Sequence, residues 1–402
     1  MQPDEHGFLH PAVDSVKCTD CGICALKCPV STPPQISVHT DALTGYANDE
    51  TLLSKSSSGA IFPVLAVEII RRGGVVFGAA FDKYFNVVHT AAETISEFSS
   101  LCSSKYVQSR IESDCYFQVK TALKAGRWVY FSGMQCQVAA LKSYLGKEYE
   151  KLITQDTVCH SVPSPMVWKD YAATLEKQYE GRLTGFSFRD KATGWESYCI
   201  RAEFDNGGEF RQTAAENSYQ RGFLKGLYSR NSCFSCKFKG IGRCSDITLA
   251  DYWGVKGIQP EAYNPQGTSL ILLHSERGRR LFESCKDQLQ TAVAADNAFT
   301  FNPAALAPIQ KPARYDEFWA GYGRMPFDDL VSVCCKPTKE ELAKERRNKS
   351  LLVRIIHKLM RERYVSTNLR NEFMDCGRLT FFAAHDLDSG RSALRRTKAN
   401  CC

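Results

Sequence analysis

The chain has 402 residues, of which 44% are hydrophobic and 24% charged, and its formal net charge is +7. This is the composition of a globular protein with room for two or three domains, and it excludes a low-complexity or fibrous chain. The modest positive charge lies largely in the C-terminal tail, so we expect no nucleic-acid partner. The longest apolar stretch, residues 60–70, is too short to cross a bilayer, so the sequence predicts no transmembrane segment.

Eighteen cysteines are a high count for a chain of this length. Secreted disulfide scaffolds are short domains without large apolar helices, and the first eleven residues show no signal-peptide pattern. Clustered cysteines without an export signal favour metal ligation in a reducing compartment. The sequence therefore predicts a cytoplasmic metalloprotein.

Residues 1–48 are expected to form a small, turn-rich module. In front of Pro29 the module carries four cysteines at C-x2-C-x2-C-x3-C spacing: Cys18, Cys21, Cys24 and Cys28. A zinc site would more often use two separated pairs or include histidine, so this run predicts a [4Fe–4S] cluster. In two-cluster ferredoxins the fourth cysteine of such a run binds the other cluster, and the chain has no second run. Cys28 therefore either completes its own cluster or lacks its partner cluster.

A mixed α/β domain is expected over residues 49–335, with a division near residue 180. Its first part alternates predicted helices, near 60–72, 116–127 and 135–145, with predicted strands, near 75–81, 85–92, 128–133 and 151–160. Its second part alternates polar and apolar residues in strands, with an Asn-Gly-Gly turn at 206–208 typical of a hairpin. Residues 336–402 are expected to be a basic, helical and partly disordered tail, with an amphipathic helix over 339–364. The predicted fold class is thus α/β, or α+β in the broader sense.

Three serines and a glycine, residues 56–59, stand directly before the helix predicted from residue 60. Free N–H groups, serine hydroxyls and the positive end of the helix dipole could bind the pyrophosphate of a flavin, although an ordinary serine N-cap is the simpler interpretation. Lys105 could neutralise a phosphate and Tyr106 could stack on a ring, although a solvated lysine is the usual case.

The segment 242–254 brings acidic residues and an aromatic ring together in Asp246, Asp251 and Trp253. Such a group could bind a ribityl chain or a substrate ring. The alternative is a polar loop that caps the sheet, and the residues themselves do not separate the two.

Cys233 and Cys236 supply only two adjacent ligands, too few for zinc or for a cubane cluster. Cys136 lies at a predicted strand-to-helix junction and Cys159 at a strand exit, positions that meet at one edge of a parallel sheet. The preferred ligand set for a second [4Fe–4S] cluster is Cys136, Cys159, Cys233 and Cys236. Cys244 could replace one of them, or Cys136 and Cys159 could simply be buried small residues.

Eight blocks between about residues 5 and 255 resemble the coenzyme F-420 hydrogenase/dehydrogenase beta subunit family, in its bacterial form with an N-terminal ferredoxin-type module. They stand in the family's order: "EHGFLHP", the first cysteine run, "SSSGAIFPVLA", "GGVVFGAAFD", "SKYVQSR", "FSGMQCQVAALKSYL", "DTVCHSVPSP" and "CFSCKFKGIGRCSDITLADYWGV". The resemblance implies an oxidoreductase that moves electrons between [4Fe–4S] clusters, a flavin such as FAD, and a second redox partner. That partner would be a protein such as a ferredoxin or a catalytic subunit, or a small-molecule substrate.

The resemblance also implies roles for individual residues. Cofactor contacts are expected from Ser57, Ser58, Gly59, Lys105, Tyr106, Asp246 and Trp253. His160 could transfer protons near the flavin or hydrogen-bond a cluster sulfur, and Asp251 is the other residue expected in catalysis. The family usually has two glycines where this chain has Gly59 and Ala60, which affects how closely a phosphate can approach.

Two further functions stay open on the sequence. One is a non-enzymatic electron-transfer subunit, in which the clusters serve a separate catalytic chain. The other is an accessory role in bacterial polysaccharide biosynthesis, which rests on the resemblance to bacterial relatives and on no particular residue.

Overall fold

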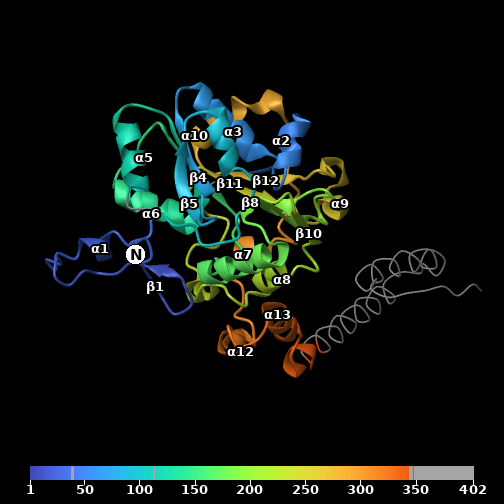
Figure 1. Cartoon of the computed structure of the whole chain (residues 1–402). Coiled ribbons are helices and arrows are strands. Elements are labelled where there is room, and N and C mark those ends of the chain that lie inside the picture. Colours follow the sequence, from blue (N-terminus) through green and yellow to red (C-terminus); the bar gives the residue numbers. More distant parts are fainter. Residues whose placement is uncertain (38–39, 112–113, 344–346, 348–402) are drawn as a thin grey trace, which may run out of the picture. The chain divides into compact units, whose positions relative to one another are not determined.

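The computed structural model of the chain describes residues 1–37, 40–111, 114–343 and 347 (Figure 1). The chain divides into two compact units, residues 1–336 and residues 337–402. The amphipathic helix predicted over 339–364 lies largely outside the described residues, so the elements below belong to the first unit.

A mixed sheet of eight strands forms the centre of the first unit and confirms the predicted α/β class (Figure 1). In sheet order its strands are β13 (Leu289–Val293), β3 (Asp41–Ala47), β12 (Ser269–Leu273), β11 (Ile247–Asp251), β7 (Leu152–Thr157), β6 (Val129–Met134), β4 (Val75–Phe81) and β5 (Val87–Ala92). Strands β11, β7, β6 and β4 run parallel, and the outer strands pair antiparallel. Since β3 lies within this sheet, the module boundary expected at residue 48 falls after a strand of the main domain.

Side-chain alternation along the strands gives the sheet two apolar faces, each covered by helices. Val76 of β4 packs in a cluster with the helices of one face, whereas its neighbour Val75 packs in a cluster with those of the other. The helices are α3 (Ile61–Arg71) and α10 (Glu276–Glu283) on the first face, and α5 (Cys115–Lys124) and α6 (Gln135–Leu145) on the second. Helix α3 confirms the helix predicted near 60–72 and ends before Gly73, whose φ of +72° suits glycine.

A second sheet of three antiparallel strands follows in the chain: β8 (Leu183–Asp190), β9 (Cys199–Phe204) and β10 (Glu209–Thr213). The turn between β9 and β10 confirms the predicted hairpin. There the Gly208 N–H donates to Asn206 Oδ1 at 2.9 Å, and Gly207 has a φ of +82°.

An aromatic core joins this small sheet to four helices: α7 (Pro165–Tyr179), α8 (Ser218–Lys225), α12 (Tyr315–Gly321) and α13 (Phe327–Cys335). Trp168 lies 5.2 Å from Phe188 and 5.8 Å from Tyr219, measured between ring centroids. The indole N–H of Trp168 donates to the carbonyl of Phe85 at 2.7 Å. This bond ties the aromatic core to the turn between β4 and β5 of the large sheet.

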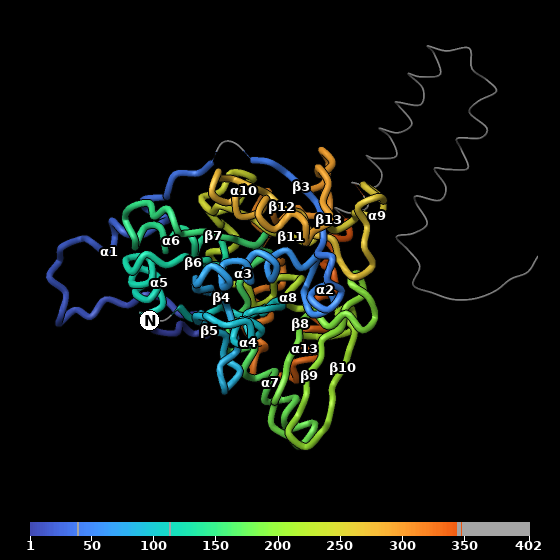
Figure 2. Tube along the Cα trace, turned by 90° about the horizontal axis from the view of Figure 1, so that it is seen from above, coloured from blue at the N-terminus to red at the C-terminus, as the bar shows by residue number. Residues whose placement is uncertain are grey.

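The N-terminal segment forms a small hairpin of β1 (Gln2–Pro3) and β2 (Leu9–His10), followed by α1 (Ile23–Leu26) within the first cysteine run. Phe8 is buried and anchors the hairpin. Within the run, directly before Cys28, Lys27 Nζ donates to the Ser143 carbonyl and Ser143 Oγ donates to the Lys27 carbonyl, both at 2.8 Å. The cysteine loop is therefore held at α6, as the views from two directions show (Figures 1 and 2).

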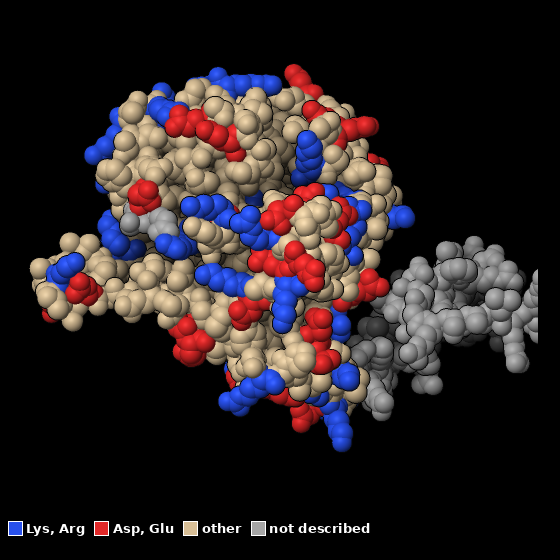
Figure 3. Space-filling view, viewed as in Figure 1, with Lys and Arg blue, Asp and Glu red and all other residues tan. Residues whose placement is uncertain are grey.

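The remaining elements are short connections: α2 (Glu50–Lys55), α4 (Ile95–Phe98), α9 (Val255–Ile258), α11 (Pro303–Leu306) and the 3-10 turns η1 (Ser99–Leu101), η2 (Asn231–Ser235), η3 (Pro260–Ala262) and η4 (Lys286–Gln288). In the described part of the chain, no helix is both long and apolar enough to cross a membrane. On the face seen in Figure 3, basic and acidic side chains are interspersed.

Candidate functional site

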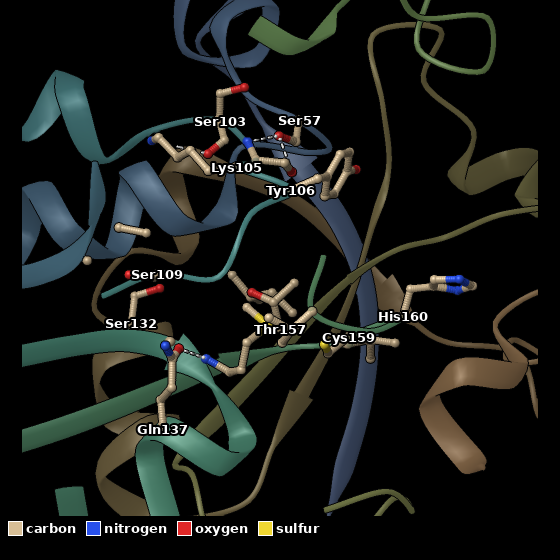
Figure 4. A pocket seen from close by; sticks show the side chains of 18 of the residues that line it. Ser57, Ser103, Lys105, Tyr106, Ser109, Ser132, Gln137, Thr157, Cys159 and His160 are labelled. Atoms are coloured by element: carbon tan, nitrogen blue, oxygen red, sulfur yellow. Dashed lines mark hydrogen bonds between the residues drawn. The ribbon is translucent and has the colours of Figure 1, made fainter. Parts of the chain in front are cut away.

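A cavity of about 710 Å³ lies at the carboxyl ends of the parallel strands β6, β7 and β11. Open α/β sheets usually bind their ligands at this edge. Nine of the predicted site residues line the cavity: Ser57, Ser58, Lys105, Tyr106, Cys136, Cys159, His160, Asp251 and Trp253. Figure 4 shows Ser57, Lys105 and Tyr106 on one side of it, across from Thr157 and Cys159.

Arg189, near the end of β8, connects four of these predicted residues. Its guanidinium forms two hydrogen bonds of 3.0 Å to the carboxylate of Asp251. It also donates to the Ser57 carbonyl at 2.9 Å and to the Tyr106 hydroxyl at 3.3 Å, and it lies 5.1 Å from the centre of the Trp253 ring. The guanidinium is almost fully buried, and its Nε has no hydrogen-bond partner among the described residues.

The hydroxyls of the serine loop are engaged within the protein. Ser57 Oγ bonds to Ser104 Oγ at 2.8 Å, and Ser58 Oγ donates to the Thr268 carbonyl at 2.9 Å. Lys191 also holds the loop, because its Nζ donates to the Ser58 carbonyl at 2.9 Å. Burial lowers the pKa of Lys191 to about 7. The loop is thus fixed by hydrogen bonds before any ligand binds.

Gly59 faces the sheet and does not line the cavity. Its N–H donates to Ser269 Oγ at 2.9 Å, and a Cβ atom at this position would lie 2.4 Å from the Gly45 carbonyl oxygen. The glycine is therefore required for close packing on β3 and β12. Ala60 follows with a φ of +60°, a left-handed conformation that favours glycine.

The ammonium group of Lys105 bonds to backbone carbonyls of the protein itself. Its Nζ donates to the carbonyls of Ser100 at 2.8 Å and Cys102 at 2.6 Å, at the end of the 3-10 turn η1. Burial lowers the pKa of Lys105 to about 8. The ring of Tyr106 stacks on Phe223 at 4.8 Å between centroids. These contacts make the two residues part of the cavity wall.

Asp246 lies outside the cavity, at the opposite end of β11 from Asp251. Its carboxylate accepts from the Thr154 N–H at 2.7 Å, from Ser275 Oγ at 2.6 Å and from Arg277 Nε at 2.6 Å. All of these partners are internal, so the structure uses Asp246 to join β7, β11 and α10.

The four cysteines of the preferred second set come together beside the cavity from three distant segments. Burial raises the pKa of the Cys136 thiol to about 12, with the nearby thiols of Cys233 and Cys236 contributing. Burial also raises the pKa of Cys159; Lys239 opposes this rise, and the other three thiols add to it. The four sulfurs therefore form one electrostatic group.

Four cysteine thiols are the donor set that a [4Fe–4S] cluster uses. Within the described residues, no group of three or more His, Cys, Asp or Glu side chains lies close enough together to hold one ion. Thiolates bound at the corners of a cubane are further apart than thiolates bound to one ion. The four cysteines of the second group, all of them half-buried, offer such a donor set in one place.

Cys244 does not join this group. It is buried with the apolar cluster beneath α5 and α6, and burial raises the pKa of its thiol to about 11. The neighbouring charges that affect it are Lys142, Asp156 and Asp246, and none of the four grouped cysteines is among them.

His160 and Arg230 lie beside the cysteine group with unused polar atoms. Burial lowers the pKa of His160 to about 4, so its ring is neutral at physiological pH. Its Nε2 and the Nε of Arg230 are buried without a hydrogen-bond partner in the described residues. Both residues line the cavity, and such atoms are suited to bonding with a group held there.

The first cysteine run is exposed, in contrast to the second group. Cys18, Cys21 and Cys24 are exposed and Cys28 is half-buried. Backbone N–H groups of Ile23 and of Ser31 are the main cause of lowered pKa values at Cys21 and Cys28, respectively. The Asp20 N–H lies 3.4 Å from Cys18 Sγ. The loop thus presents N–H donors to three of its sulfurs.

A family model for the C terminus of the coenzyme F420 hydrogenase/dehydrogenase beta subunit matches residues 126–297. This segment of the chain is similar to that part of the beta subunit. The match confirms the resemblance seen in the sequence, and the matched range includes all four cysteines of the second group. The first cysteine run and the serine loop precede that range.

Twelve chains of solved structures also match this chain. One belongs to the F420-reducing [NiFe] hydrogenase complex from Methanosarcina barkeri, derivatised with xenon. It has 14% sequence identity and a TM-score of 0.44, over 78% of this chain and 92% of that chain. No curated protein sequence matches the chain.

Sequence reasoning missed three residues of the site. Arg189 and His89 both line the cavity, and neither was singled out. Arg230 contacts His10 at 2.9 Å and also lines the cavity. The only signal in the sequence is a charged or polar residue inside an otherwise apolar run, such as the arginine of "FSFRD", and that pattern is also typical of a solvent-facing position.

Proposed function

We propose that the chain is an iron–sulfur flavoprotein oxidoreductase, which passes electrons between [4Fe–4S] clusters, a flavin, and a small substrate or redox protein. The observation that carries the proposal is the group of four cysteine thiols at the wall of a large cavity. The similarity of residues 126–297 to a hydrogenase/dehydrogenase beta subunit supports the redox chemistry.

Eight cysteines would hold the clusters in this proposal. Cys136, Cys159, Cys233 and Cys236 would bind the cluster beside the cavity. Cys18, Cys21, Cys24 and Cys28 would bind the other, within an N-terminal ferredoxin-type module of residues 1–48. The clusters supply one-electron transfer when bound, and the exposed position of the first run suits exchange with a protein partner such as a ferredoxin or a catalytic subunit.

The flavin, FAD or a related one, would lie in the cavity of the domain formed by residues 49–335. A flavin supplies the change between one-electron and two-electron transfer when bound. The cavity has an aromatic and a cationic wall made by Tyr106, Arg189 and Trp253, which suits a planar ring with anionic groups. The volume of about 710 Å³ lies within the range of cofactor sites.

His160 and Asp251 take different parts in this proposal. The neutral His160 ring has its Nε2 available at the cavity wall, where it can bond to a cluster sulfur or hold a proton for the substrate. Asp251 is bound by Arg189 and by the indole N–H of Trp195, at 2.9 Å. Its carboxylate therefore fixes the arginine that contacts the serine loop.

The test is anaerobic purification followed by analysis of iron, sulfide and flavin. Two clusters and one flavin correspond to about eight irons and about one flavin per chain. Zinc in place of iron would overturn the redox proposal. Full clusters without any flavin would instead favour a non-enzymatic electron-transfer subunit.

A further inference from the structure

Three chain segments bring the four cavity-side cysteines together, and they are far apart in the sequence. The first is the start of α6, where Gln135 precedes Cys136. The second is the end of β7, which leads to Cys159. The third is the loop 233–244, which begins with the remaining two cysteines. Something other than the ligands must hold these segments in register while a cluster is absent.

The side chain of Arg243 contacts all three segments. Its guanidinium donates to Gln135 Oε1 and lies 3.4 Å from the carboxylate of Asp156 on β7. It also donates to the carbonyl of Phe238, inside the third segment, at 3.2 Å. A fourth bond, of 3.2 Å, goes to the carbonyl of Ala305.

We propose that Arg243 is a positioning residue that sets the spacing of the four cysteines for the second cluster. The inference rests on the proposed function, because it presumes that these cysteines bind a cluster. A guanidinium can serve several acceptors in fixed directions at once, whereas the ammonium of lysine is a single point of charge. Arg243 is only 3% exposed, so its contacts act in a medium of low dielectric, where an ill-placed partner is costly.

The same residue is connected to the chain that follows the first cysteine run. The carbonyl of Arg243 accepts from the Ser37 N–H at 2.8 Å. On the other side, Asp156 accepts from the hydroxyl of Thr248, and that hydroxyl bonds to His274 Nε2 at 2.9 Å. His274 Nδ1 bonds in turn to Thr40 at 2.9 Å. Arg243 therefore contacts both the chain that follows the first cysteine run and the segments that carry the second group of thiols.

Arg243→Lys tests the proposal in the full chain, purified without oxygen. We expect iron to fall from about eight to about four per chain, because the second cluster is lost while the first remains. The electron paramagnetic resonance spectrum of the reduced protein should keep the signal of the first cluster alone. Arg277→Lys is the matched control, since Arg277 forms a buried ion pair with Asp246 on the same sheet and bonds otherwise to Glu148 and the Tyr149 carbonyl. The control should retain about eight irons.

Gln135→Met provides a second, milder variant in case the lysine variant does not fold. It removes one acceptor of the guanidinium next to Cys136 and leaves the charge in place. We expect the second cluster to form but to lose iron to a chelator about tenfold faster, as the loss of one charged hydrogen bond predicts.

The outcomes separate this inference from the proposed function. A wild-type chain with about four irons and the spectrum of the first cluster alone would remove the second cluster, and the positioning role with it. If the wild type and Arg243→Lys both hold about eight irons with the same spectrum, the positioning role alone is wrong. Unchanged chelator kinetics in Gln135→Met would contradict it as well.

Discussion

Arg189 and Asp251 face each other in a two-pronged ion pair, with both nitrogen-to-oxygen distances at 3.0 Å. Arg189 belongs to β8 of the small sheet and Asp251 to β11 of the large one. The pair therefore joins the two sheets at the cavity. It also brings the carbonyl of Ser57 and the hydroxyl of Tyr106 to the same guanidinium.

The first prediction concerns this ion pair. Asp251→Asn removes the negative charge and leaves the buried guanidinium without its counter-ion. Breaking a buried pair in this way costs about 3 kcal/mol or more, so the free energy of unfolding should fall by that order. We expect the flavin content to fall too, because Arg189 would no longer be held against the serine loop. Denaturant unfolding and flavin absorbance per chain measure the two effects.

Asp205→Asn is the control for that substitution. Asp205 pairs with Arg182 at 3.0 Å, but the Arg182 side chain is 88% exposed. Exposed pairs contribute about 1 kcal/mol or less, so this variant should unfold almost like the wild type and keep its flavin. Equal losses of stability in the two variants would show that the Arg189 pair has no special role.

The second prediction separates the candidate ligands of the second cluster. Cys159→Ser should lose about four irons per chain, because Cys159 belongs to the group of four coupled thiols. Cys244→Ser should retain all its iron, since Cys244 is buried with apolar residues away from that group. Iron analysis and the spectrum of the reduced protein distinguish them. If Cys159→Ser kept its iron and Cys244→Ser lost it, Cys244 and not Cys159 would be the ligand.

The third prediction concerns Cys28, whose role the sequence leaves open. The N–H groups of Ser31 and Val30 lower the pKa of Cys28, much as the Ile23 N–H does at Cys21. Backbone N–H groups thus act on both sulfurs in the same way. We expect Cys28→Ser to lose the first cluster alone, with the second still visible by spectroscopy. A full complement of iron in this variant would show that the thiolate of Cys28 is dispensable.

The sequence predicts the parts of the site that depend on local pattern. Cysteine spacing singles out the thiols, and alternation of apolar runs gives the order of helices and strands. Asp246 and Asp251 are two residues that the sequence pattern does not distinguish. Asp246 directly precedes β11 and Asp251 is its last residue. The strand has five residues at about 3.3 Å each, so the two carboxylates lie at opposite edges of the sheet. Only the edge with Asp251 carries the cavity, and the sequence does not say which edge that is.

Arg189 shows a second limit. Its burial depends on a carboxylate 62 residues further along the chain and on two aromatic rings, Tyr198 and Trp253. Pattern alone treats an arginine beside an aspartate at a strand end as solvent-facing, because charged residues are seldom buried without a partner. The partner becomes visible only when the two sheets are placed together.

The last prediction is a loss of stability in mild acid. Burial lowers the pKa of His89 to about 4, from an ordinary value of 6.5, with the Ser132 carbonyl opposing and Lys105 adding to the effect. Burial likewise lowers the pKa of His274 to about 4. Between about pH 6.5 and pH 4 the unfolded chain binds protons that the folded chain does not, so the free energy of unfolding decreases as the pH falls through this window.

Each such histidine changes the free energy of unfolding by up to about 1.4 kcal/mol per pH unit within this window. His89→Gln should remove the contribution of His89. The variant is less stable at pH 7, because it changes the bonds of the ring to Ser109 and Ser132, but its unfolding midpoint should move less between pH 7 and pH 5. His274→Gln should flatten the profile in the same way, and the double variant should flatten it further. Profiles parallel to that of the wild type would mean that these two rings are protonated as readily in the folded protein as in the unfolded chain.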